Sequence, residues 1–85
     1  MKVILQKYGQ VLGSRKVAEE IRKGLKFPVE FDCKDVLLSH SFADELFGKL
    51  GQELGPEKFK SNIKIINLEE NNKIMIRYVL EDRAK

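Results

Sequence analysis

The sequence predicts a single α/β domain over residues 1–85, with a small sheet of three to four strands and three helices in the order β-(β)-α-β-α-β-α. Stretches with the apolar pattern of strands occur at 3–7, 29–33 and 63–68. Segments with apolar residues at helical spacing lie between and after them. A chain of 85 residues buries only about 60–65% of its unfolded surface, so it supports one modest core.

The amino-acid composition and the distribution of charge argue against several classes of function. The chain is 42% hydrophobic and 34% charged, with 16 basic and 13 acidic residues and a net charge of +3. The two signs are interspersed, with no run of five or six basic residues, which makes nucleic acid an unlikely partner. No stretch is long and apolar enough for a membrane span or a signal peptide, and the single cysteine gives no disulfide or metal framework. We therefore expect a cytoplasmic domain without membrane association, metal or cofactor.

The first elements are a strand at 3–7, a turn at Gly9 and a short second strand at 10–12 that returns as a hairpin. Ser14 is a favoured N-cap for the first helix. The buried face of that helix is expected to carry Val17, Ala18, Ile21 and Leu25. Pro28 has no amide donor, so it belongs at the first position of the next strand.

Val29, Phe31 and Cys33 alternate along that strand, which predicts a buried, unreactive cysteine. The apolar run 36–38 follows, and the second helix is expected to run from Ser41 to Glu53. Its buried stripe should contain Ala43, Leu46, Phe47, Leu50 and Leu54.

Residues 63–68 are apolar on both faces and rich in β-branched side chains, as an interior strand would be. The segment 71–83 fits both a helical and an alternating pattern. We predict a helix, because strands that alternate with helices favour a crossover sheet. Met75, Tyr78 and Val79 are expected to face inward.

Ser41 opens the second helix and is the sharpest candidate residue. With Asp44 three positions on, it has the spacing of a capping box, and a cap alone would explain it. The functional interpretation is a phosphoacceptor or contact residue on a partner-facing surface. A phosphate there would be favoured by the helix N-terminus but repelled by Asp44 and Glu45.

The residues beside Ser41 have competing interpretations. His40, Ser39 and Asp44 have the chemistry of a Ser-His-Asp relay, but neighbouring side chains on one turn rarely converge as a triad requires. Phe42 fits either an edge of the core or an exposed anchor for a partner. Asp32 ends a strand near the same edge, where a solvated strand face explains a carboxylate.

The tract from Val29 to Leu50 resembles the STAS domain of anti-sigma factor antagonists, whose usual tract reads Asp-Leu-Ser-Gly-Val-x-x-Ile-Asp-Ser-Ser-Gly-Leu. Asp32 aligns with its first Asp, Val36 with its Val, and Ser41 with the serine that is phosphorylated in those antagonists. The tract is more similar to a STAS-like family of unknown function, through Asp32…Val36…Ser41-Phe42-Ala43-Asp44-Glu45-Leu46. His40 and Phe42 depart from the antagonist pattern, as do Asp44 and Glu45.

The resemblance implies a STAS-like fold and a non-catalytic regulatory module. Its implied partner is a protein, a histidine-kinase-like ATPase or related regulator, bound through the start of the second helix. The expected contact residues, beside the phosphoacceptor candidate Ser41, are Asp32, Ser39, His40, Phe42, Asp44 and Glu45. The alternative is a small nucleotide- or nucleic-acid-binding protein that uses its helix N-termini and basic residues.

Overall fold

Two small parallel sheets contain the strands of the computed structural model, which describes residues 1–85. The first sheet has the order β1-β3-β5, and the second pairs β2 with β4. Their bounds are β1 (Lys2–Ile4), β2 (Val11–Leu12), β3 (Val29–Asp32), β4 (Leu37–Leu38) and β5 (Ile63–Ile66). All three pairings are parallel, so every connection between paired strands crosses over through a helix.

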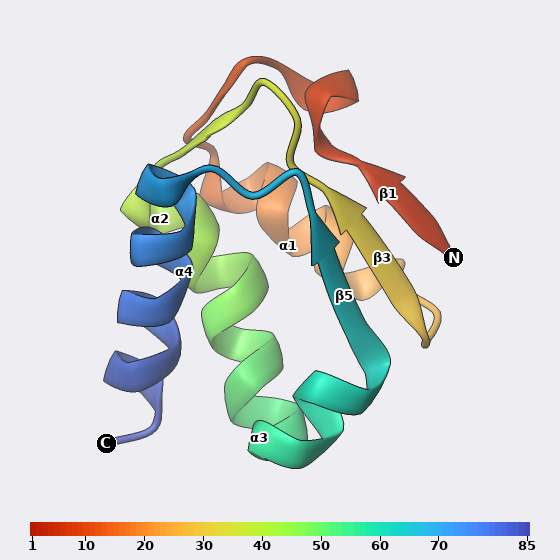
Figure 1. Ribbon diagram of the computed structural model, residues 1–85, viewed down its shortest axis with the longest axis vertical. Coiled ribbons are helices and arrows are strands. Elements are labelled where there is room, and N and C mark those ends of the chain that lie inside the picture. Colours follow the sequence, from red (N-terminus) through yellow and green to blue (C-terminus); the bar gives the residue numbers. More distant parts are fainter.

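The helices gather on one side of the three-stranded sheet, apart from the short helical turn that follows β1 at the end of the sheet (Figure 1). They are the 3-10 helix η1 (Leu5–Tyr8), α1 (Arg15–Lys23), α2 (His40–Ala43), the π-helix η2 (Asp44–Gly48), α3 (Lys49–Asn62) and α4 (Glu70–Arg83). Because α2, η2 and α3 follow one another without a break in sequence, the chain has three main helical units. The predicted α/β class and the order of elements are confirmed.

The N-terminal prediction was wrong in two respects. The strand ends at Ile4, opposite Asp32, where the β1–β3 ladder ends, and η1 then turns the chain. The second short strand forms no hairpin with the first, because it pairs in parallel with β4, Val11 opposite Leu37. Ser14 caps α1 as predicted, with its hydroxyl accepting a hydrogen bond from the amide of Val17.

The second helical unit begins and ends differently from the prediction. Its N-cap is Ser39, whose hydroxyl accepts from the amide of Phe42 at 3.1 Å, so Ser41 lies inside the first turn. The unit also continues past Glu53. Gly55, with φ of +81°, breaks the helix, and Pro56 restarts it, since proline fits the first turn of a helix.

The core is centred on the middle of this unit. Seven consecutive residues, 42–48, are buried, including both carboxylates and Gly48. A helix that is buried all round lies inside a protein rather than on its surface. Phe31 from β3 and Phe47 meet edge to face, with ring centroids 5.1 Å apart, and this contact joins the helix to the sheet.

The C-terminal segment is a helix, as predicted, but its inward face differs in part. Val79 is buried as expected and Met75 is half-buried, whereas Tyr78 is 55% exposed. Ile76 and Asn72 take the remaining inward positions. Because apolar side chains surround this helix, their spacing alone did not fix which of them face the core.

Asn72 explains how α4 is attached at its first turn. Its side-chain amide donates to the carbonyl of Val36 at 2.8 Å and accepts from the amide of Leu38 at 3.0 Å. These are the two bonds that a neighbouring strand would make with β4. Asn72 therefore bonds the peptide groups on the free edge of β4 and places α4 beside that edge. No helix of the chain is both long and apolar enough to cross a membrane.

Cys33 is fully buried, which raises the pKa of its thiol to about 11. Because the thiolate is the reactive form, we expect a thiol reagent to label the native protein far more slowly than the unfolded protein. Cys33→Ala should lower the free energy of unfolding by about 1 kcal/mol through a small cavity. Mass spectrometry of labelled samples and urea unfolding measure the two effects. Labelling of the native thiol at the unfolded rate would contradict the burial.

Candidate functional site

Asp44 is a buried carboxylate held by two arginines from distant parts of the chain. The Arg83 guanidinium donates two hydrogen bonds to it, at 2.8 and 2.7 Å, and Arg15 donates a third at 3.0 Å. Gly48 leaves the space for this arrangement, since a Cβ there would lie 2.8 Å from an oxygen of Asp44 and 3.3 Å from the Arg83 side chain. The contacts tie α1 and α4 to η2.

Glu45, the next residue, has its own set of cations. Lys49 lies 2.9 Å away, Arg22 donates to the carboxylate at 3.1 Å, and Arg15 donates at 3.3 Å. Arg22 also bonds Glu53. The two adjacent carboxylates are therefore neutralised by side chains from α1, α3 and α4.

This environment lowers the pKa of both carboxyl groups. For Asp44 the main cause is the pair of hydrogen bonds from Arg83, followed by the bond from Arg15. For Glu45, burial acts to raise the pKa, but the bonds from Lys49, Arg22 and Arg15 outweigh it and the pKa falls. Both groups are therefore ionised at neutral pH.

The expectation that Asp44, Glu45 and Phe42 face a partner was wrong. The two acids are 7% and 2% exposed and already paired, and Phe42 is fully buried within the core. The physical reason is that η2 is covered on every side, so the polar positions of this helix have charged partners instead of water. The start of the helix keeps only Ser39, His40 and Ser41 near solvent.

Those three residues have different environments. Ser39 is half-buried and fixed, because its hydroxyl caps α2 and its amide donates to the carbonyl of Leu12 at 2.9 Å. Ser41 is half-buried in the first turn. A phosphate on Ser41 would meet less repulsion than the sequence suggested, since Asp44 and Glu45 are neutralised by their cations.

His40 is exposed, and its ring and that of Tyr78 meet edge to face, with centroids 5.5 Å apart. Together with Asn71, Ile74 and Met75 they line an open hollow of about 370 Å³ between α2 and α4. Asp44, the acid that a Ser-His-Asp relay would use, is bound to Arg15 and Arg83 instead.

Asp32 lies at the end of the three-stranded sheet rather than at the start of α2. Its carboxylate accepts hydrogen bonds from the side chain of Asn67 at 2.9 Å and from the amide of Lys34 at 3.0 Å. Both bonds lower the pKa of Asp32, and the bond from Asn67 has the larger effect. Its partners show that Asp32 organises the turns after β3 and β5.

Large apolar side chains are exposed on α4 beside His40 and on the β2–β4 pair that Asn72 joins to α4, and sequence reasoning missed most of them. Val11 and Leu37 lie opposite each other on β2 and β4, and Asn72 joins β4 to the first turn of α4. On α4, Ile74 and Tyr78 are one helical turn apart, beside His40. We call Val11, Leu37, His40, Ile74 and Tyr78 the rim patch. In the sequence, the only sign of this patch was that β2 and β4 each carry an apolar residue on the side away from the core, Val11 and Leu37.

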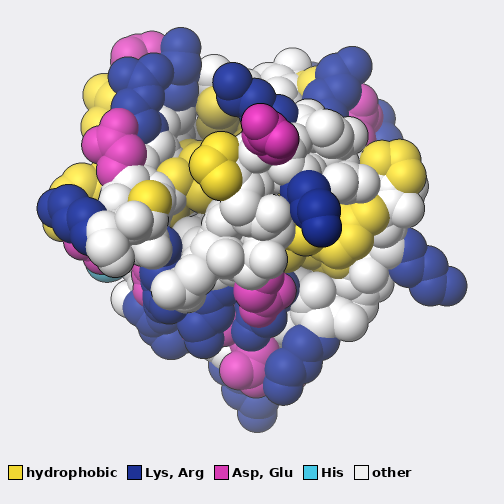
Figure 2. Space-filling model, turned by 90° about the horizontal axis from the view of Figure 1, so that it is seen from below, with side chains coloured by type: hydrophobic (Ala, Val, Ile, Leu, Met, Phe, Trp, Pro, Cys, Tyr) yellow, Lys and Arg dark blue, Asp and Glu magenta, His cyan; other side chains and the backbone are white.

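Charges elsewhere on the surface are mixed. On the face shown in Figure 2, Lys and Arg side chains are interrupted by Asp and Glu and by uncharged surface, so they form no continuous basic area there. Groove or backbone recognition of nucleic acid requires clustered cations. This face therefore lacks the clustered cations that nucleic-acid binding requires.

Comparison with known proteins identifies the family. A family model described as a STAS-like domain of unknown function (DUF4325) matches residues 14–73. No curated protein matches the chain, and no solved structure matches it. The matched span contains α1 through β5 and the first turn of α4, and so includes Ser39, His40 and Ser41.

The buried charges predict a mutational effect. Asp44→Asn should lower the free energy of unfolding by about 3 kcal/mol, because it leaves Arg83 and Arg15 without their shared carboxylate. Glu19→Gln is the matched control, since it removes an exposed pair with Lys23 and should change stability by less than about 0.5 kcal/mol. Urea unfolding measures both. Equal effects of the two variants would contradict the importance of this cluster.

The same cluster predicts a pH dependence. Because the pKa values of Asp44 and Glu45 are lowered on folding, the unfolded state binds more protons in acid. The free energy of unfolding should therefore fall as the pH drops below about 5. In Asp44→Asn this fall should be shallower. Urea unfolding at several pH values tests the prediction, and parallel curves for the two proteins would contradict it.

Proposed function

The chain belongs to the STAS-like domain family, and we propose that it is a non-catalytic regulatory module that binds a protein partner through the rim patch. The proposed surface is centred on His40 and Tyr78 and extends over the exposed apolar residues of β2, β4 and α4. Ser41 lies beside it and is the candidate for its regulation. No step of chemistry on a substrate is required of these residues.

One observation carries the proposal. Val11, Leu37, Ile74 and Tyr78 are 72%, 51%, 57% and 55% exposed, and they make up four of the seven large apolar residues at the surface, the others being Met1, Tyr8 and Phe27. Apolar side chains grouped on the surface of a small domain are typical of protein interfaces. Tyrosine is also among the residue types that contribute most to binding energy.

The partner is proposed to be a protein that presents apolar side chains to this patch. The resemblance to anti-sigma factor antagonists suggests a histidine-kinase-like ATPase, since antagonists of that fold bind such kinases. The buried charge cluster supports a rigid surface, because Arg83 and Asn72 fix α4 at its two ends. A rigid patch loses little conformational freedom on binding.

Ser41 supports a regulated form of this binding. It follows His40 in the first turn of α2, where the helix N-terminus favours negative charge. A phosphate would add a charge of about −1.5 to −2 beside a patch whose contacts are apolar. Desolvating that charge in an interface is unfavourable, so phosphorylation would weaken binding.

Tyr78→Ala is expected to weaken binding by more than about 1 kcal/mol, roughly fivefold in Kd. Because Tyr78 is more than half exposed, its stability cost should be small. Phe27→Ala is the matched control, since Phe27 is also exposed but lies outside the rim patch. Calorimetry against the histidine-kinase-like ATPase encoded nearest this gene measures affinity, with thermal melts in parallel. The proposal fails if the two variants bind alike.

Ser41→Asp tests the regulatory role separately. The variant should fold as well as the parent protein, because an acidic residue suits the first turn of a helix. Its affinity for the same ATPase should fall, whereas Ser41→Ala should bind like the parent. If Ser41→Asp binds with unchanged affinity, Ser41 has no part in regulating the binding, and the proposed role of Tyr78 is unaffected.

A further inference from the structure

The outer edge of β5 is an unpaired strand edge. β5 ends the order β1-β3-β5 and pairs only with β3. The carbonyl of Ile66 accepts a hydrogen bond from the amide of Cys33 on the β3 side. Because successive peptide groups of a strand alternate between its two edges, the N–H and C=O of Ile65 face away from β3. Native proteins usually block such an edge or use it.

The devices that usually block an edge strand are mostly missing from β5. Its sequence is Ile63-Lys64-Ile65-Ile66, with no proline and a single charge. Ile65 and Ile66 are half-exposed, so the strand presents apolar side chains on both faces of the sheet. An edge with this pattern favours addition of another strand, which is a common mode of peptide recognition.

The charges on the open face of the sheet indicate which kind of strand fits. Lys2, Glu30 and Lys64 lie in one row across β1, β3 and β5. Glu30 pairs with Lys2 at 3.7 Å and with Lys64 at 3.8 Å. The row therefore reads positive, negative, positive, and the Lys64 side chain is 74% exposed. A strand added next to β5 continues the alternation when it places an acidic residue beside Lys64.

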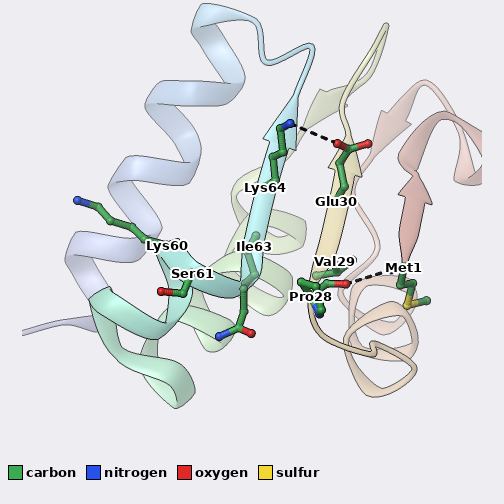
Figure 3. Close-up of a pocket in the computed structure, with 9 residues that line it drawn as sticks. Met1, Pro28, Val29, Glu30, Lys60, Ser61, Ile63 and Lys64 are labelled. Atoms are coloured by element: carbon green, nitrogen blue, oxygen red, sulfur yellow. Dashed lines mark hydrogen bonds and ion pairs between the residues drawn. The ribbon is translucent and has the colours of Figure 1, made fainter.

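A second lysine, Lys60, lies near the start of β5. The open cavity at this end of the sheet is lined by Lys60 and Lys64 and also by Met1, Pro28 and Glu30, so it lies on the side of β5 that faces β3 and leaves the outer edge separate from it. Figure 3 shows Lys64 directed toward Glu30 and Lys60 projecting on the side of β5 opposite β3. Lys60 has no ion-pair partner among the salt bridges of the structure, so the outer side of β5 offers an additional positive charge.

A second copy of the chain fits this edge less well. An antiparallel pair centred on Lys64 places two lysines directly opposite each other, which is destabilising. A pair centred on Ile65 avoids this, but it extends to Asn67, whose φ of +55° takes it out of the strand. A partner with acidic and apolar residues satisfies both the edge and the charge row.

We propose that the outer edge of β5 binds an extended segment of a partner protein as a fourth strand. The segment places an acidic side chain beside Lys64 on the open face and apolar side chains beside Ile63 and Ile65 on the helical side. This site is separate from the rim patch, so it does not depend on the proposed function.

A charge exchange tests the proposal. Random ten-residue peptides displayed on phage are selected in parallel on the parent protein and on Lys64→Glu. The parent should enrich peptides that alternate apolar residues with an acidic one, and Lys64→Glu should enrich basic residues at the same place. A synthetic peptide from the first selection should lose at least tenfold in affinity for Lys64→Glu, and changing its acidic residue to lysine should restore binding.

Three controls locate the site. Peptide binding should shift the amide resonances of residues 63–66, and Lys2→Glu, in the same charge row at the far edge, should leave affinity within twofold. Ile65→Pro removes the N–H at the outer edge. Made in the parent protein it should abolish binding of the acidic peptides, and made in Lys64→Glu it should abolish binding of the basic peptides. The proposal is overturned if no peptide is enriched, if the charge preference does not reverse, if resonances shift only at the rim patch, or if sedimentation shows that β5 pairs with a second copy.

Discussion

The ion pairs of Asp44 and Glu45 are the constraint on which the rest of the structure depends. Two adjacent carboxylates lie in the most buried helical segment of a small domain, and neither can lose its cations without a large desolvation cost. The cations come from α1, α3 and α4. Moving any of these three helices away from η2 would leave at least one of the acids with fewer cations. Apolar packing alone would tolerate several arrangements.

This arrangement decides where the protein can make external contacts. Because η2 is enclosed, only residues 39–41 at the start of the helix bring the STAS-like motif to the surface. Asn72 and Arg83 then place α4 against the start of this helix, and the position of α4 brings Tyr78 beside His40. The surface beside the motif is thus completed by a helix that is distant in sequence, and its shape depends on the buried charges.

Local patterns in the sequence were sufficient to predict the helices and strands, but not which residues would contact one another across the chain. Helical and alternating periodicity located the three main strands and the three helical units, and Ser14 was correctly identified as a cap. Ser39 and Ser41 are chemically equivalent as caps, so the sequence could not choose between them. The burial of Asp44 could not be predicted, because its main partner, Arg83, is 39 residues away. The parallel pairing of Val11 with Leu37 is likewise a long-range contact.

The family match covers the whole of β5 but only part of the rim patch. Residues 14–73 include His40, Ser41 and the whole of β5, whereas Val11, Ile74 and Tyr78 lie outside. Properties carried by the matched span are candidates for what members of the family share. The apolar residues outside it are better candidates for selecting a particular partner. On this argument, the first turn of α2 and the edge of β5 would carry features shared by the family, each at its own site, and Val11 of β2 with the exposed residues of α4 would select the protein that binds the rim patch.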